Sequence, residues 1–222
     1  MTWERTRHML RLRAALREYF SAVLEISNEL DMPLAGPTIL GLLAKASTPE
    51  QAAKLTTRQL KPLLYRQQKQ DHKLARIRAI LRSDDHLGQP AIIASAYAVT
   101  VQSTVTVLTT IITQIELLET EVKTHFGRHP AAEILTSQPG MGPINGARVL
   151  AEFGDAPGRY RTPKARKNYA GTSPITRQSG RTRHVQARHV RNNRLADALA
   201  SQALSALSTD PYARAYYDQQ RA

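Results

Sequence analysis

Two stretches of this chain carry apolar side chains at intervals of three or four residues, and this spacing strongly constrains the fold. It places the side chains on one narrow stripe of an α-helix, as at the a and d positions of a heptad. The first stripe consists of Met9, Leu12, Leu16, Tyr19, Val23, Ile26 and Leu30. The second consists of Val101, Val105, Leu108, Ile112, Ile115, Leu118 and Val122. The chain is therefore predicted to be mainly α-helical.

Flanking residues set the limits of these two helices. Asp31-Met32-Pro33 is expected to stop the first, while Gln89-Pro90 precedes the second and Gly127 ends it. Long helices with narrow apolar stripes bury them against each other or against a second copy. An antiparallel helical bundle and a coiled-coil dimerisation arm both fit the pattern. We predict that residues 1–127 form a helical linker and coiled-coil oligomerisation region, and that the protein is a homo-oligomer.

The composition changes after residue 127, where Gly, Pro and positive charge become concentrated. We place a domain boundary there and assign residues 128–222 to a small helical domain. A short helix is expected to run into Gln138-Pro139-Gly140-Met141-Gly142-Pro143, with a second helix following from about Ile144. This pattern is typical of a helix-hairpin-helix. Gly140 and Gly142 permit positive φ and leave N–H groups open, which suits a phosphate at the start of the second helix. A packing turn without a ligand is the alternative.

Three further elements are expected in this domain. A short helix starts at Thr162-Pro163 and is ended by Gly171. The following segment is predicted to be a loop or a short β-ribbon with its turn at Ser179-Gly180. An amphipathic helix from Asn193 to Ser208 and a last helix after Asp210-Pro211 complete the prediction.

The segment from Arg159 to Arg194 contains eleven Lys or Arg residues and no Asp or Glu, in a chain of net charge +13. Like charges at this density repel one another, and binding to a polyanion relieves the repulsion. Nucleic acid is therefore the predicted partner, with an acidic protein as the weaker alternative. The candidate binding residues are Gly140, Gly142, Arg159, Arg161, Lys164, Arg166, Lys167, Arg177, Arg181, Arg183, Arg188, Arg191 and Arg194.

Composition also excludes several classes of protein. The chain has no Cys, which rules out disulfides, thiolate zinc sites and Cys nucleophiles. Its seven His residues show no metal-ligand spacing, and His184 and His189 are expected to contact phosphate or solvent. No secretory signal and no apolar run of about 18 residues is visible. We expect a cytoplasmic protein without membrane association.

Several strings in the chain resemble the IS110 family of insertion-sequence transposases. PGMGP, KARKNYAGTSP and the QSG turn resemble its C-terminal domain, and WERTRHMLRLRAALREYF and AEILTSQPG resemble its coiled-coil linker. The resemblance implies DNA transposition by a Ser nucleophile that forms a covalent link to DNA. It also implies a bridge RNA that pairs with donor and target DNA, and an oligomer formed through the coiled coil. A bacterial, nucleoid-associated location follows.

Carried over by position, the resemblance makes Ser179, within Arg177-Gln178-Ser179-Gly180, the nucleophile, and Ser173 the alternative. A Ser hydroxyl needs a base or a metal to take its proton, and the phosphorane needs nearby cations. Arg177, Arg181 and Arg183 are expected to supply that charge.

The family also has an N-terminal RNase-H-like domain whose DEDD carboxylates bind Mg²⁺, and no such segment precedes Trp3. This departure predicts a truncated copy that binds no metal itself, with Mg²⁺ required only together with that N-terminal domain. A non-catalytic module that binds nucleic acid, oligomerises and modulates an intact transposase is the alternative function.

Overall fold

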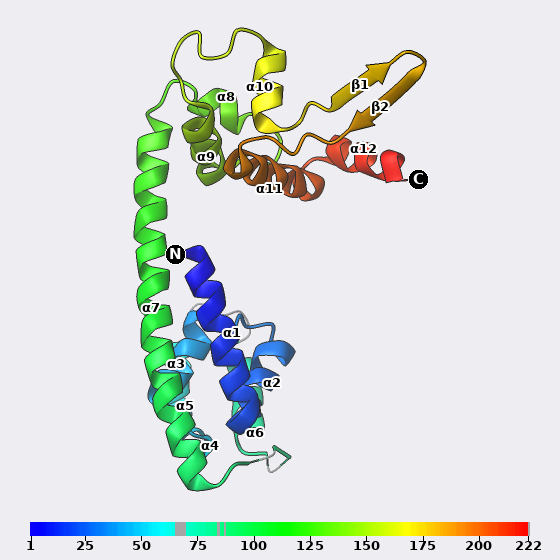
Figure 1. Ribbon diagram of the computed structural model, residues 1–222. Coiled ribbons are helices and arrows are strands. Elements are labelled where there is room, and N and C mark those ends of the chain that lie inside the picture. The colour runs from blue at the N-terminus through cyan, green and yellow to red at the C-terminus, as the bar shows by residue number, and fades with distance from the viewer. Residues whose placement is uncertain (65–69, 84, 87, 222) are drawn as a thin grey trace. The chain divides into compact units, whose positions relative to one another are not determined.

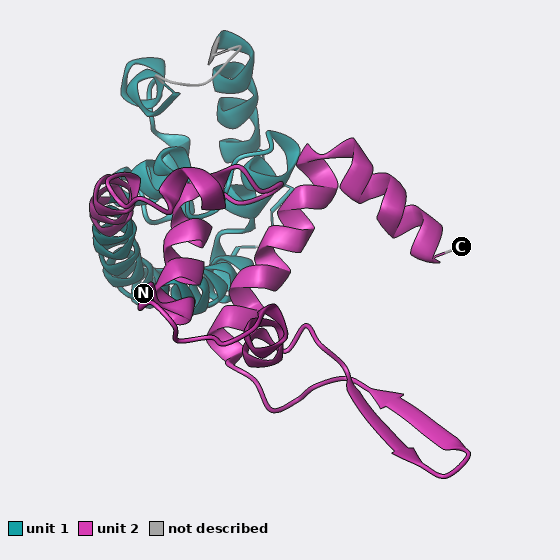
Figure 2. Ribbon diagram, turned by 90° about the horizontal axis from the view of Figure 1, so that it is seen from above, with its two compact units in different colours: residues 1–116 teal, residues 117–222 magenta. Residues whose placement is uncertain are grey.

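The computed structural model describes residues 1–64, 70–83, 85, 86 and 88–221. The chain divides into two compact units, Met1–Glu116 and Leu117–Ala222 (Figure 2). The division falls within one long helix, whereas the sequence predicts a boundary at residue 127. The assignment of residues 1–127 to oligomerisation and 128–222 to transposase chemistry stays a prediction. The described residues are mainly α-helical with a single two-stranded antiparallel ribbon, which confirms the predicted fold class.

The first unit consists of short helices and the first part of a long one (Figure 1). They are α1 (Thr2–Tyr19), α2 (Ser21–Glu29), α3 (Pro37–Lys45), α4 (Pro49–Ala53), α5 (Thr57–Leu60), the 3₁₀ helix η1 (Lys61–Leu64), α6 (Gln70–Leu81) and α7 (Ala91–Gly127). Helix α7 follows Pro90 and ends at Gly127, as predicted.

The first predicted helix is wrong in one respect, because the chain leaves the helical conformation at Phe20. Phe20 has φ −144° and ψ 55°, so α1 and α2 are separate helices. No Gly or Pro marks this break. Phe20 is 2% exposed, and burying an aromatic ring of this size favours the bend. The apolar spacing continues across the break because both helices face the same core.

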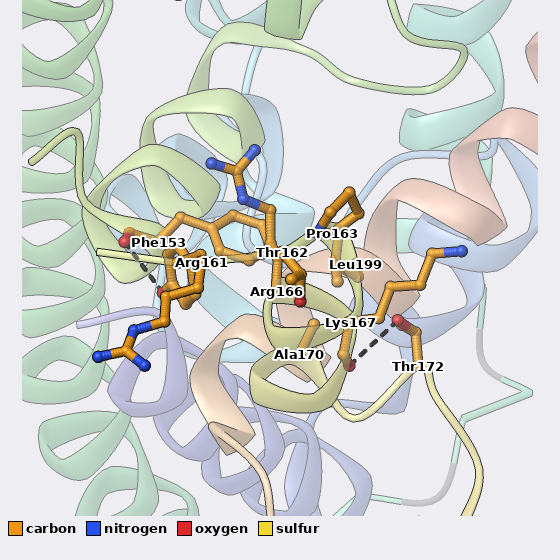
Figure 3. A pocket seen from close by; sticks show the side chains of 10 residues that line it. Phe153, Arg161, Thr162, Pro163, Arg166, Lys167, Ala170, Thr172 and Leu199 are labelled. Atoms are coloured by element: carbon orange, nitrogen blue, oxygen red, sulfur yellow. Dashed lines mark hydrogen bonds between the residues drawn. The ribbon is translucent and has the colours of Figure 1, made fainter. Parts of the chain in front are cut away.

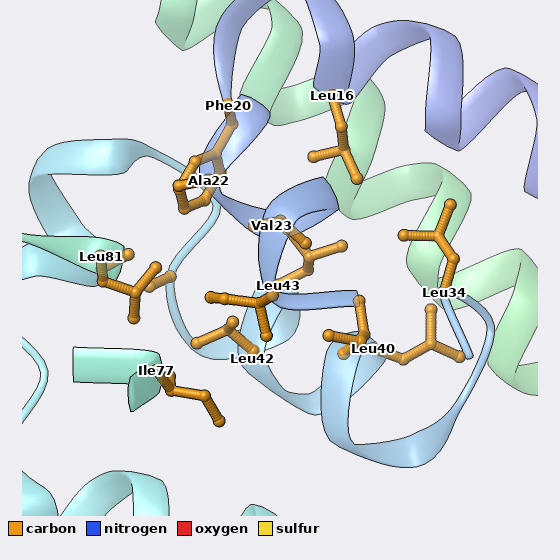
Figure 4. Packing of buried hydrophobic residues seen from close by; sticks show 14 of the residues in the cluster. Leu16, Phe20, Ala22, Val23, Leu34, Leu40, Leu42, Leu43, Ile77 and Leu81 are labelled. Carbon is orange, nitrogen blue, oxygen red and sulfur yellow. The ribbon is translucent and has the colours of Figure 1, made fainter. Parts of the chain in front are cut away.

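Both apolar stripes enter that core. Leu12 and Leu16 from α1 are buried in the same cluster as Val101, Val105 and Leu108 from α7. Figure 4 shows other members of the cluster converging from several helices. Within this unit the bundle interpretation is therefore confirmed. A coiled coil with a second copy stays a prediction.

Helix α7 has the length and apolar composition of a helix able to cross a membrane. Its buried residues, such as Ala98 and Val101, belong to the core of the first unit. Helices in the cores of soluble proteins share this composition.

The second unit begins with the last part of α7 and continues through short helices and one ribbon (Figures 1 and 2). The elements are α8 (Ala132–Thr136), α9 (Pro143–Phe153), α10 (Pro163–Ala170), β1 (Ile175–Ser179), β2 (Thr182–Gln186), α11 (Asn193–Thr209) and α12 (Pro211–Arg221). Its small buried core consists of Met141, Val149, Ala170, Leu195 and Ala198.

Side-chain caps fix the starts of two helices close to the predicted positions. The Thr162 hydroxyl accepts a hydrogen bond from the Ala165 N–H, and Pro163 is the first residue of α10. The Asn192 side chain accepts one from the Leu195 N–H at the start of α11. Such caps satisfy amides that have no partner inside the helix. In the sequence, α10 precedes the ribbon and α11 follows it.

Candidate nucleic-acid interface

The β-ribbon presents Ser179 at its tip. Strands β1 and β2 pair antiparallel, with Ser179 opposite Thr182 and the two-residue turn Gly180-Arg181 between them. Gly180 has φ 55°, a left-handed conformation that glycine adopts without strain. The ribbon extends away from the helices of the second unit in both views (Figures 1 and 2). Of the two predicted alternatives, loop and ribbon, the ribbon is confirmed, although its turn lies one residue later than the predicted Ser179-Gly180. Ser179 is exposed to solvent.

The strand register decides which groups share a face with Ser179. Because side chains alternate along a strand, Ser179 and Arg177 lie on one face of β1. Arg177 is paired with His184, so this imidazole occupies the same face. Arg183 is paired with Gln178 and lies on the other face. Of the two strand arginines expected near Ser179, only Arg177 therefore shares its face, while Arg181 lies in the turn.

Ser173, the alternative nucleophile, precedes the ribbon and is half-buried. The backbone carbonyl of Ser173 accepts a hydrogen bond of 3.1 Å from Nε of Arg188. This contact assigns Arg188 a part in holding the ribbon. The two serines therefore differ in environment. The backbone of Ser173 is held at the base of the ribbon by Arg188, whereas Ser179 is exposed at its tip.

The positive charge of the 159–194 segment is almost uncompensated. Within the described part of the chain, its only ion pair with a carboxylate joins Arg194 to Glu152 at 3.9 Å. The side chains of Lys164, Arg166 and Lys167 are exposed on α10. Arg191 packs against Gly171, where a Cβ would approach its Cδ to 2.2 Å. Ten of the eleven cations are thus left without an acidic partner, which is the arrangement expected of a phosphate-binding surface.

The two glycines of the hairpin, Gly140 and Gly142, differ in the space around them. Gly140 has φ 71°, and a Cβ there would lie 2.4 Å from the backbone N of Ala206 in α11. Gly142 precedes α9 and has open space around it. Close packing on α11 accounts for glycine at position 140, so Gly142 is the better placed of the two for a phosphate. Whether either binds one stays a prediction.

Helix α9 and the residues just after it contact neighbours from α7, from α11 and from the segment between α7 and α8. Phe126, near the end of α7, packs against Gly146. The Asn145 amide donates to the carbonyl of Ala198 in α11 at 3.2 Å. His129 contacts Asp155 at 3.2 Å, and this hydrogen bond lowers the pKa of the Asp155 carboxyl. The Nδ1 atom of His129 accepts from the Ala131 N–H, so Nε2 carries the proton that is donated to Asp155.

No three His, Asp or Glu side chains of the described residues come close enough to hold a metal ion. The residues around Ser179 supply no carboxylate, because the sequence has none between Asp155 and Asp197. This donor set does not fit Mg²⁺, which prefers carboxylate oxygens.

Two features of the site were not identified from the sequence. One is the position of His184, which was expected only to contact phosphate or solvent; the alternation of side chains along β2 would have placed it on the face of Ser179. The other is an aromatic cluster of Phe153, Tyr160 and Tyr169, with ring centroids 5.7–6.5 Å apart. These three rings are irregularly spaced in the sequence, so only the tertiary structure brings them together. Arg159 and Arg166 lie over members of this cluster at 5.4–5.6 Å from the ring centroids.

Residues 132–218 match the model of the family described as Transposase IS116/IS110/IS902. The chain is 38% identical over 222 residues to the mini-circle candidate transposase for IS117 of Streptomyces coelicolor, covering 99% of this chain and 53% of that protein. It is 34% identical over 125 residues to an uncharacterized 43.6 kDa protein of insertion element IS110 from the same organism, covering 56% and 31%.

A similar match joins the chain to an uncharacterized 42 kDa protein of insertion element IS900 from Mycobacterium paratuberculosis. The two are 34% identical over 128 residues, covering 54% of this chain and 32% of the relative. No solved structure matches the chain significantly. The chain spans about half the length of the first of these relatives, and the other two alignments cover about a third of theirs.

Proposed function

We propose that this chain, whose residues 132–218 match the IS116/IS110/IS902 transposase family, binds insertion-element DNA and carries the strand-cleaving nucleophile at Ser179. The observation that supports this best is the exposed serine at the ribbon tip, within a segment in which ten of the eleven cations lack a carboxylate partner. Such a tip can enter a nucleic-acid groove without steric hindrance from the helices of the second unit. The proposed DNA substrates are the element ends and the target.

The proposed step links the protein to DNA. Attack by Ser179 Oγ on a phosphodiester forms an Oγ–P bond and breaks one P–O ester bond. The hydroxyl proton then passes to a base, and the departing strand oxygen gains a proton. We assign the acceptor role to His184, which lies diagonally across the ladder on the same face, about 7–8 Å away between Cα atoms. This imidazole can return the proton to the departing oxygen.

Arg177 is the cation best placed to stabilise the charge that develops on the phosphorane oxygens. A carboxylate-bound Mg²⁺, which the family resemblance implies, does not fit the residues around Ser179. The chain spans only part of its relatives, and transposase activity is proposed for it rather than observed. We also propose that it binds a bridge RNA, forms a homo-oligomer and is located in the cytoplasm, associated with the nucleoid. Leu118 and Val122, from the predicted stripe of α7, are exposed and available for that oligomer.

The absence of carboxylates from the 159–194 segment favours a second candidate function. In this alternative the chain binds nucleic acid and oligomerises without cleaving, and modulates an intact transposase. Both candidates require binding to DNA, but only the first forms a covalent species.

Denaturing electrophoresis of the full chain after incubation with labelled element-end DNA and Mg²⁺ distinguishes the two. The incubation is run with the chain alone and with an added intact family transposase that carries Ser→Ala at its own nucleophile. We expect a labelled band at the mass of this chain plus DNA, and no such band with Ser179→Ala. Ser173→Ala is the matched control and should retain the band.

His184→Gln should slow formation of the adduct by about a hundredfold or more, because it removes the proton acceptor. DNA affinity measured by fluorescence anisotropy should be unchanged in Ser179→Ala. An adduct that persists in Ser179→Ala would refute the assignment of the nucleophile. Tight DNA binding without any adduct in either incubation would favour the non-catalytic module.

A further inference from the structure

A partly open pocket of about 440 Å³ lies in the second unit, beside α10. Figure 3 shows its lining side chains, which come from the end of α9, from α10 with the segment before it, and from α11. Its apolar walls are Phe153, Tyr160 and Leu199, and its basic residues are Arg161, Arg166 and Lys167. The pocket therefore combines flat apolar surfaces with several cations.

The aromatic walls are held in place by their own contacts. The rings of Phe153 and Tyr160 meet edge to face, with centroids 5.9 Å apart. The Tyr160 hydroxyl donates a hydrogen bond of 3.1 Å to the Phe153 carbonyl. The guanidinium carbon of Arg166 lies 5.5 Å from the centroid of Phe153 and 5.4 Å from that of Tyr160. Nucleobases stack on aromatic rings and on guanidinium planes, and both surfaces are already in position here.

The charge of the pocket selects for an anionic ligand. Within the described part of the chain, Arg161, Arg166 and Lys167 form no ion pair with a carboxylate, and no acidic side chain lines the pocket. Glu152, close by in the sequence, instead pairs with Arg194 and accepts from the Asn192 amide at 2.7 Å. A neutral apolar ligand would leave these cations uncompensated, whereas phosphates on either side of a base would neutralise them.

The size of the pocket limits how much of a ligand can enter. Its volume falls in the range of about 300–1,000 Å³ that is typical of small-ligand sites. A single nucleotide fits such a volume. A base that is paired and stacked within a duplex cannot enter it. A base can reach the aromatic walls only from a single strand or after being turned out of the helix.

We propose that this pocket receives one unstacked nucleobase of a bound DNA strand. The base stacks against the aromatic walls and the Arg166 guanidinium, and the flanking phosphates contact Arg161 and Lys167. This proposal rests on the DNA binding proposed above, and adds that the protein engages unpaired nucleotides in the unit that also carries the ribbon. It requires no chemistry at Ser179.

The test compares two single-stranded DNA oligomers of 12 nucleotides, one with thymine bases and one of abasic residues, which carry the same phosphate charge. Binding of the full chain is measured by fluorescence anisotropy. Base stacking on aromatic side chains changes affinity by about 5- to 150-fold, so we expect about tenfold tighter binding of the thymine strand. The Arg166→Lys variant retains the charge but loses the planar group, and should reduce this preference to about threefold or less. Tyr160→Leu should do the same.

Arg183→Lys, on the ribbon, is the matched control and should alter the affinity for both strands alike. Thermal unfolding and circular dichroism establish that each variant is folded, and Arg166→Lys, a surface change, tests the proposal if Tyr160→Leu does not fold. Equal binding of both strands by the unaltered chain would overturn the pocket proposal while leaving the DNA-binding proposal intact. A preference that stays near tenfold in a folded Arg166→Lys variant would also overturn it. Failure to bind either strand and also a DNA duplex of the element end would instead contradict the proposed function itself.

Discussion

The two units of this protein are both mainly helical, but they differ in how much apolar surface they bury. The first unit gathers side chains from seven α-helices into one large core, with aromatic residues such as Tyr19 and Phe20 fully inside. The second has a small core and leaves its ribbon and most of its cations in solvent. A large core stabilises its fold well without a ligand. The second unit instead exposes the charge that a polyanion would neutralise, so part of its stability is expected to come from binding.

The contrast between the cores predicts the largest effect in the first unit. Leu16→Ala should lower the free energy of unfolding by about 2–5 kcal/mol, because the side chain is fully buried and its removal leaves a cavity. Leu10→Ala on the same helix should change it by less than about 0.5 kcal/mol, since Leu10 is 56% exposed. Urea denaturation followed by circular dichroism measures both. Equal losses in the two variants would show that the buried stripe does not stabilise this unit.

A single glycine gives the sharpest test of packing in the second unit. Gly140→Ala should lower its stability by about 2–4 kcal/mol, because a Cβ at positive φ would also overlap the backbone of α11. Gly142→Ala should cost about 1 kcal/mol or less, since the space around it is open. Hydrogen exchange read by mass spectrometry should show faster exchange in α9 and α11 only for Gly140→Ala. An unchanged exchange pattern would contradict the close approach of the turn to α11.

The two units also differ in exposed positive charge, and the effect expected from removing one charge is smaller than the effects of the packing changes above. Arg177→Gln should reduce the slope of log affinity against log salt by about 1, because one phosphate contact is lost. Arg11→Gln, an exposed residue of the first unit, removes the same charge and should leave the slope unchanged. Titration of a DNA duplex at several salt concentrations gives both slopes. A loss of slope in both variants alike would mean that the two units share the DNA contact.

The smallest effects concern one ion pair in each unit. Hydrogen bonding to Arg76 lowers the pKa of Glu29, and hydrogen bonding to His129 lowers that of Asp155. A carboxyl with a depressed folded pKa stabilises the protein above its unfolded pKa, and this stabilisation is lost as the pH falls through the folded value. Glu29→Gln and Asp155→Asn should therefore each flatten the decline in stability below about pH 4. Thermal melts between pH 2 and pH 7 measure this, and an unaltered acid limb would assign the decline to other groups.

Much of the helix pattern could be predicted because its signals are local. Gly127 ends α7, and Thr162 and Asn192 cap the next helices with side-chain oxygens that reach amides three residues on. The break at Phe20 was missed because it carries no local signal and arises from burial of a ring in a core built from distant helices. The same limitation applies to Gly140, whose turn was predicted but whose contact with α11 was not.

The sequence by itself determined the helical class, the acid-free basic segment and the serines within it, since composition and residue spacing are properties of the chain alone. It also carried the resemblance to the IS116/IS110/IS902 transposases, through strings of residues that can be compared without knowing the fold. Only the tertiary structure decided that the predicted ribbon forms with Arg177 paired to His184, and that Phe153, Tyr160 and Arg166 meet around one pocket. Strand register and helix packing are set by contacts between residues far apart in the chain, and no local pattern specifies them.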